Sequence, residues 1–115
     1  MRLFRRGGRT RGAEPSRTGR GEIAEGERHL QSFATSRRGV EAYIEPATTV
    51  TATTVVLIAG DGEWTRRRVA DPRAARALAE RLRIPVYEAA VVGYPQRMRE
   101  WNRRKAEQER GGRDE

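Results

Sequence analysis

The uneven placement of aliphatic and aromatic residues constrains the fold of this chain more than any other feature of its sequence. Leu, Ile, Val and Phe account for only 19 of the 115 residues, and 14 of those 19 fall between Val40 and Val92. So small a share, spread evenly through a chain of net charge +8, would be typical of a disordered protein. Concentrated in one stretch, it predicts a single small domain with weakly apolar segments on both sides.

The positive charge lies mainly at the two ends of the chain. Residues 1–20 carry a net charge of +6, residues 21–93 carry none, and residues 94–115 carry +2. We therefore expect a disordered basic arm over residues 1–21, one folded domain with a C-terminal helix over residues 22–109, and a disordered tail over residues 110–115.

Hydrophobic periodicity predicts a helix followed by three strands in the first half of the domain. Apolar residues recur at helical spacing over residues 23–36, and they alternate with polar ones over residues 40–45. Residues 55–58 are apolar on both faces, as in a central strand. The turn residues Gly60, Asp61 and Gly62 then predict a hairpin, with residues 64–69 as its returning strand.

The second half predicts helix, strand and helix. Asp71-Pro72 is a helix start, because the aspartate caps the free amides and proline suits the first helical position. This helix should end before Pro85, with a strand over residues 86–92 and a last helix from Gln96 to about Glu109. The predicted fold class is α+β: a small single domain, ordered helix-strand-strand-strand-helix-strand-helix, with an antiparallel sheet packed by helices.

Three consecutive arginines on the returning strand form the first candidate site. Strand alternation places Trp64, Arg66 and Arg68 on one face and Arg67 on the other. Guanidinium groups beside an indole could bind phosphate and stack on a base. The alternative is an edge strand whose charges prevent association with other strands and whose arginines pair with Glu41, Glu45 and Glu63.

The last helix is the second candidate, because it combines basic residues with aromatic ones. Its arginines form a candidate nucleic-acid-binding face that we expect to point outward, and Tyr94, Met98 and Trp101 are either anchors for a protein partner or a core stripe. The arginines are Arg97, Arg99, Arg103 and Arg104.

The basic arm is the third candidate. Several arginines that neutralise phosphates would give nucleic-acid binding that weakens with salt and ignores sequence. The arm could instead be a solubilising tail, or it could lie on an anionic membrane surface. The arginines predicted to bind are Arg5, Arg6, Arg9 and Arg11.

Catalytic and metal chemistry has little support in the sequence. There is no cysteine and His29 is the single histidine, which excludes a cysteine nucleophile and histidine-rich or thiolate metal sites. No loop has the form that holds a nucleotide cofactor. We therefore predict no catalytic residue, no metal ligand and no cofactor. The short apolar runs and the absence of a secretory signal favour a cytoplasmic location.

Two resemblances add to these inferences. The segments DGEWTRRRV at residues 61–69 and GYPQRMR at residues 93–99 resemble a group of small uncharacterised arginine-rich proteins of GC-rich bacteria. Some members are called oxidoreductases, a name that implies a redox cofactor but assigns no residue here. The predicted order of elements over residues 23–83 is similar to that of double-stranded RNA-binding domains, although the second helix begins without their lysine cluster.

The leading hypothesis from the sequence is a non-enzymatic accessory module that binds RNA or a ribonucleoprotein surface. The arm, the strand arginines and the C-terminal helix would carry the binding. The alternative is a protein-interaction module or homodimer anchored by Tyr94, Met98 and Trp101. The third hypothesis is an enzyme whose chemistry, redox or other, the sequence does not identify.

Overall fold

Helices and strands form along residues 17–114, which are the part of the chain that the computed structural model describes. The protein is α+β, as the sequence predicts. The elements, in chain order, are α1 (Arg17–Ser36), β2 (Glu41–Glu45), β3 (Thr54–Ile58), β4 (Trp64–Arg68), α2 (Pro72–Leu82), β5 (Val86–Glu88), α3 (Ala89–Val92) and α4 (Gln96–Asp114).

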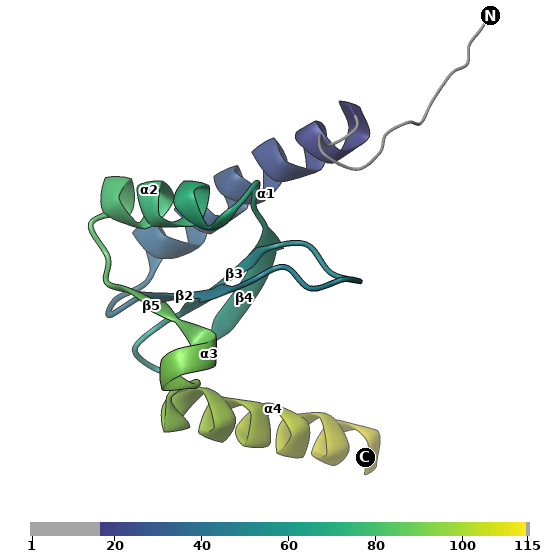
Figure 1. The fold of residues 1–115 in the computed structure, drawn as a ribbon. Helices are drawn as coiled ribbons and strands as arrows, with labels where there is room; N and C mark the ends of the chain where they lie inside the picture. Colours follow the sequence, from purple (N-terminus) through teal and green to yellow (C-terminus); the bar gives the residue numbers. More distant parts are fainter. Residues whose placement is uncertain (1–16, 115) are drawn as a thin grey trace, which may run out of the picture.

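The strands form one sheet in the order β4-β3-β2-β5, with helices on both faces. Figure 1 shows α1 and α2 on one face and α4 on the other, so that the molecule has three layers. The strand β3 is central, and alternate side chains of its apolar run enter the two helix-covered faces. The prediction of a central strand is therefore confirmed.

The sheet is mixed, which corrects the prediction of a purely antiparallel one. β2 and β3 pair antiparallel, as do β3 and β4, but β5 pairs parallel with β2. The cause is α2, which carries the chain from β4 on one edge to β5 on the other. A helical crossover returns the chain in its original direction, so β5 runs with β4 and hence with β2.

Two cores lie on opposite faces of the sheet. The larger packs Leu30 and Phe33 of α1 and Leu78 of α2 against the sheet, where Val55 and Leu57 are almost completely buried. The smaller packs Met98 of α4 on Tyr43, Val56 and Ile58. Because the second core is small, the polar contacts described below also position α4.

The starts of α2 and β4 follow the sequence closely. The Asp71 side chain accepts a 2.8 Å hydrogen bond from the Ala74 amide, and Pro72 is the first helical residue. In the predicted hairpin, the Ala59 amide donates to the Glu63 carbonyl at 2.8 Å around the turn. Both predictions are confirmed.

Three boundaries differ from the prediction. The first helix begins at Arg17 rather than Ile23, so residues 17–21 of the predicted arm are helical, whereas residues 1–16 lie outside the described part. The predicted strand over residues 86–92 is wrong beyond Glu88, where α3 begins. The last helix continues through Gly111 and Gly112 to Asp114 instead of ending near Glu109.

Candidate nucleic-acid interface

The face of the sheet that looks toward α4 carries Trp64, Arg66 and Arg68 of the predicted site. Pairing register aligns its side chains in rows across β2, β3 and β4. One end row joins Glu41, Ile58 and Trp64, and the middle row joins Tyr43, Val56 and Arg66. The row at the other end, which joins Glu45, Thr54 and Arg68, is wholly polar.

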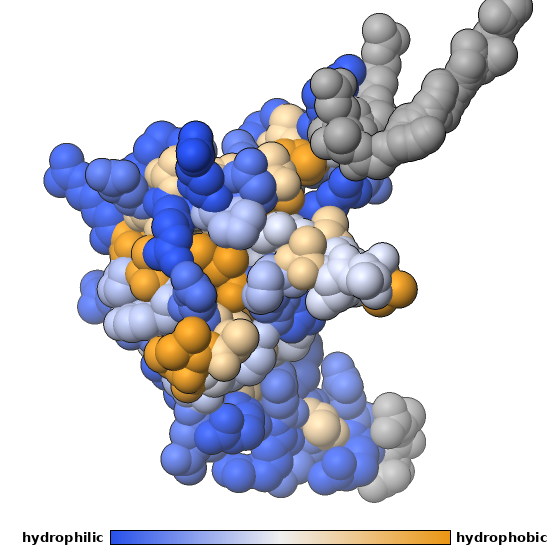
Figure 2. All heavy atoms as spheres, viewed as in Figure 1, coloured by the Kyte–Doolittle hydropathy of each residue, from blue (hydrophilic) through white to orange (hydrophobic). Residues whose placement is uncertain are grey.

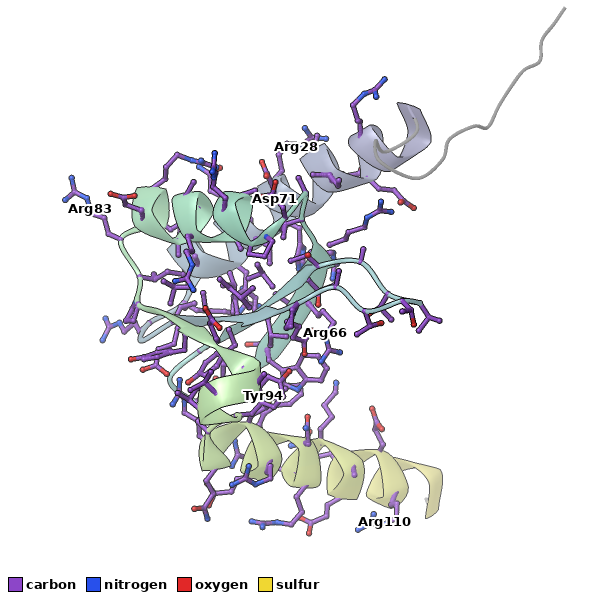
Figure 3. All side chains as sticks on the ribbon, in the orientation of Figure 1. Arg28, Arg66, Asp71, Arg83, Tyr94 and Arg110 are labelled. Carbon is purple, nitrogen blue, oxygen red and sulfur yellow. The ribbon has the colours of Figure 1, made fainter. Side chains whose placement is uncertain are left out.

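Glu45 organises the polar part of this face. Its carboxylate accepts hydrogen bonds from Arg66 Nε at 2.8 Å and Nη2 at 2.9 Å, from the Thr54 hydroxyl at 2.5 Å, and from the Tyr94 hydroxyl. Burial alone would raise the pKa of Glu45, but these hydrogen bonds outweigh it and lower the pKa below its ordinary value. Glu45 therefore stays ionised and fixes both Arg66 and Tyr94, which lie between the sheet and α4 (Figure 3).

The arginines of β4 lie on an open edge of the sheet. The hydrogen bonds from Ala59 to Glu63 and from Val69 to Thr53 turn the backbone groups of the odd-numbered β4 residues toward β3. Those of Trp64, Arg66 and Arg68 therefore face outward. The Arg67 guanidinium donates to the Arg66 carbonyl at 2.7 Å, which covers one edge acceptor. β4 is thus an edge strand, as the alternative predicts, and Arg67 protects the edge. Of the three carboxylates predicted to pair with the arginines of β4, only Glu45 does so, through Arg66.

Arg97 holds α4 to the sheet, so the prediction that it points outward is wrong. Its Nη2 donates to Glu41 at 2.7 Å and its Nε to the Ala59 carbonyl at 2.9 Å. The Arg97 hydrogen bond is the main cause that lowers the pKa of Glu41. Arg104 also turns inward, because its Nη2 donates to the Asp61 carbonyl at 3.1 Å.

The aromatic residues and methionine of this region pack within the molecule. Met98 is 7% exposed, and Tyr94 and Trp64 pack beside it. Trp64 Nε1 donates to Asn102 Oδ1 at 2.7 Å, which joins β4 to α4. Trp101 is half-buried, and Lys105 Nζ lies 5.6 Å from the centre of its indole ring. The core-stripe interpretation of Met98 and Tyr94 is therefore confirmed.

Gly62 permits the close approach of α4 to the β3–β4 turn. The residue is buried at φ +97°, and a Cβ atom there would lie 2.1 Å from the Arg97 carbonyl oxygen. Only glycine fits this backbone conformation and this distance. The first turn of α4 thus rests directly on the hairpin turn.

The outward surface of α4 presents cations. Arg99, Arg103 and Arg110 share one side of the helix by their spacing of four and seven residues. The structure places no carboxylate of residues 19–111 within 4 Å of the Arg103 or Arg110 guanidinium. Arg99 donates to the Tyr94 carbonyl at 3.1 Å and remains exposed. Figure 2 shows α4 covered almost entirely by hydrophilic side chains.

The opposite face of β4 packs against α1. His29 Nε2 lies 2.8 Å from the Thr65 hydroxyl, and Gly26 lies where a Cβ would meet Arg67 Cβ at 3.3 Å. Burial and the neighbouring Arg67 and Arg37 lower the pKa of His29, so it is neutral at pH 7. His29 therefore has a structural role, because it joins α1 to β4.

The structure brings together only part of the predicted site. Arg66 and Tyr94 meet at Glu45, and Trp64 packs in the same cluster as Tyr94 beside the Arg66 guanidinium. Arg67 lies on the other sheet face, and Arg103 is exposed on α4. Arg5, Arg6, Arg9 and Arg11 lie outside the described residues. Sequence reasoning did not select Glu45 as the organising residue or Thr54 as part of the site, although strand alternation and register were the signals that could have aligned them with Arg68.

The described part of the chain holds neither a metal cluster nor a membrane-spanning helix. Within residues 17–114 no three His, Asp or Glu side chains are grouped so that they could hold a metal ion. None of the helices there has both the length and the apolar composition needed to cross a bilayer. Comparison with protein-family models, curated proteins and solved structures finds no match to this chain.

Proposed function

We propose that this protein is a non-enzymatic module that binds RNA or a ribonucleoprotein surface in the cytoplasm. The basic arm, the arginines of β4 and the outward surface of α4 would contact the phosphate backbone. Arginine suits this role because its fixed charge and planar group of donors match phosphate geometry. The net charge of +8 favours a polyanionic partner.

The observation that carries the proposal is that the carboxylates in and beside the strands are already paired with arginines inside the fold. Glu41, Glu45 and Glu63 are each paired with one arginine, namely Arg97, Arg66 and Arg37. These pairs stabilise the fold, and they leave none of these three carboxylates to pair with the other arginines. The exposed arginines of β4 and α4 that take no part in these three pairs are Arg67, Arg68, Arg99, Arg103, Arg104 and Arg110.

The test compares two double variants that remove equal charge. Arg103→Gln with Arg110→Gln changes the outward surface of α4, and Arg73→Gln with Arg81→Gln changes exposed positions of α2. A phosphate contact to single-stranded RNA contributes about 0.7 to the salt exponent, which is about fivefold in affinity at 0.1 M salt relative to 1 M. We expect the α4 variant to bind a fluorescent RNA octamer about 25-fold more weakly, and the α2 variant to bind like the unchanged protein.

Two outcomes would contradict the proposal. Equal loss in both double variants would show that net charge alone attracts the RNA. Absence of RNA binding by the unchanged chain, together with absence of RNA in protein purified without nuclease, would remove the proposed function altogether.

A protein-interaction module is the second candidate function, and an exposed apolar patch favours it. Val91 and Val92 of α3 are 76% and 56% exposed, and Tyr87 of the short edge strand β5 is 37% exposed. Figure 2 shows apolar side chains at the surface in the region of α3. The patch is distinct from Met98, which is buried within the chain. Sedimentation of the Val91→Lys variant beside the unchanged protein tests for a homodimer through α3, which predicts a smaller species for the variant.

A further inference from the structure

A groove lies at the polar end of the sheet, beyond the part that α4 covers. Its volume is about 660 Å³, which is within the range of about 300–1,000 Å³ found for small-molecule sites. Its lining residues come mainly from the loop 46–53 between β2 and β3 and from the C-terminal half of β4. The loop projects from the sheet in Figure 1. The lining residues are Glu45, Pro46, Thr48, Thr51, Ala52, Thr54, Arg66 and Arg68.

The loop wall is held in shape by its own hydrogen bonds. The Thr48 hydroxyl accepts from the amides of Val50 and Thr51 at 3.2 and 3.0 Å, and it lies 2.7 Å from the Thr51 hydroxyl. The Thr48 amide in turn donates to the Thr51 carbonyl at 2.9 Å. The groove therefore has a wall that is formed before any ligand arrives, which reduces the entropy cost of binding.

The Arg66 guanidinium offers the groove a fixed plane rather than a free charge. Both of its hydrogen bonds to Glu45 lie in that plane, and they neutralise its charge. Its Cζ lies 5.2 Å from the centre of the Trp64 ring, which packs behind it along the strand. A guanidinium plane fixed in this way is a surface on which a nucleobase stacks.

Arg68 supplies the charge that Arg66 lacks. It is the next residue on the same face of β4, so the Cα atoms of the two arginines lie about 7 Å apart along the strand. The Arg68 guanidinium pairs with Glu22 of α1. Its ion pair with Glu22 spans 3.7 Å and leaves its side chain 42% exposed, so water screens the pair strongly. Arg68 can therefore turn toward a phosphate without giving up a strong contact.

We infer that this groove binds one unpaired nucleotide of an RNA strand, with the base against Arg66 and the phosphate at Arg68. The inference rests on the proposed function and narrows it to single-stranded RNA at this site. A base inside a duplex cannot enter, because its faces are covered by its neighbours.

The first test fills the groove without touching the Glu45 network. Ala52 is exposed and lines the groove, so Ala52→Leu places apolar bulk in it. Val50 is 87% exposed on the same loop but does not line the groove, so Val50→Leu is the matched control. Stacking of a base on an aromatic ring strengthens binding by roughly 5- to 150-fold, and we take the low end of this range for a guanidinium plane. We expect Ala52→Leu to weaken binding of a uridine octamer at least fivefold, with no change for Val50→Leu or for duplex RNA.

The second test uses uridine 5′-monophosphate as the probe and backbone amide NMR of the full chain as the readout. The amides of Thr51, Ala52 and Thr54 should shift on addition of the nucleotide. They should shift less at the same concentration in Arg68→Gln, whose affinity for the octamer should fall about fivefold. Arg73→Gln, on α2, should behave like the unchanged protein.

The outcomes separate this inference from the proposed function. Normal octamer binding by Ala52→Leu, with shifts spread along α4 instead of the loop, would overturn the groove assignment and leave RNA binding standing. Uridine monophosphate binding in the groove without octamer binding would overturn the assignment to an RNA strand. Absence of octamer binding by the unchanged protein would contradict both proposals.

Discussion

The substitution Gly62→Ala tests how α4 is positioned against the sheet. The new Cβ would lie 2.1 Å from the Arg97 carbonyl oxygen, whereas real Cβ atoms stay beyond 3.0 Å. The first turn of α4 must therefore move by at least 0.9 Å. Such a movement would disrupt both hydrogen bonds that Arg97 donates, at 2.9 Å to the Ala59 carbonyl and at 2.7 Å to Glu41.

The size of the effect follows from two terms. A non-glycine residue at φ +97° costs about 1–3 kcal/mol, and loss of one hydrogen bond to a charged group costs about 1.5–3 kcal/mol. Gly93 is the control for a positive φ without a close contact, because it has φ +73° and ψ −176° but nothing within 4 Å of an added Cβ. Gly93→Ala should therefore show a backbone cost without a contact cost. The two variants should differ by about 2 kcal/mol, or about 8–16 °C in Tm.

Thermal unfolding followed by circular dichroism and by tryptophan fluorescence measures this difference. The chain has only two tryptophans, and both report on α4, since Trp101 belongs to it and Trp64 donates to Asn102. We expect Gly62→Ala to change the fluorescence of the folded state as well as the Tm. Equal Tm values for Gly62→Ala and Gly93→Ala would refute the close approach of α4 to the turn.

Four further measurements concern the same framework. Arg97→Gln should destabilise the fold by about 1.5–3 kcal/mol in urea denaturation, because Glu41 loses its partner in a half-buried position. Since the folded-state pKa values of Glu41 and Glu45 are lowered, their contribution to stability is present above the ordinary value near 4.5 and is lost as pH falls through the folded-state values. Glu45→Gln should accordingly flatten the acid side of the stability curve. Burial and the hydrogen bond to Glu41 raise the pKa of Tyr43 to about 12. Part of the phenolate absorbance should therefore appear only at a higher pH than that of an ordinary tyrosine, and Tyr43→Phe should remove that part. Gly111→Ala should stabilise α4 by up to about 1 kcal/mol, because glycine is a poor residue inside a helix, and helical ellipticity should rise.

Local signals in the sequence were sufficient for the elements that depend on local chemistry. Asp71-Pro72 specifies the start of α2, and the apolar run of β3 specifies a strand buried on both faces. The stretch from Val86 to Val92 misled the prediction because a short apolar run fits a strand and a helical turn equally well. Tertiary packing, which periodicity does not describe, decides between them.

The site was harder to predict than the fold because it depends on partners distant in sequence. Arg97 has the same local pattern as Arg103, yet it turns inward because Glu41 and the Ala59 carbonyl lie within its reach. Glu45 becomes the organising residue only once Thr54, Arg66 and Tyr94 have been brought to it by sheet pairing and by α4. The parallel pairing of β5 could have been predicted, since a helix connects it to β4.

The salt dependence of RNA affinity tests the central claim most directly. Binding of a uridine octamer should be measured from 0.05 to 0.5 M salt for the full chain and for a chain that lacks residues 2–16, which contain five arginines. With about 0.7 per phosphate contact, deletion of the arm should make the slope of log affinity against log salt shallower by up to about 3.5, and a residual slope of about 1–2 should remain from β4 and α4. A slope near zero for the full chain, or loss of all salt dependence with the arm, would contradict the claim that the folded part itself binds the phosphate backbone.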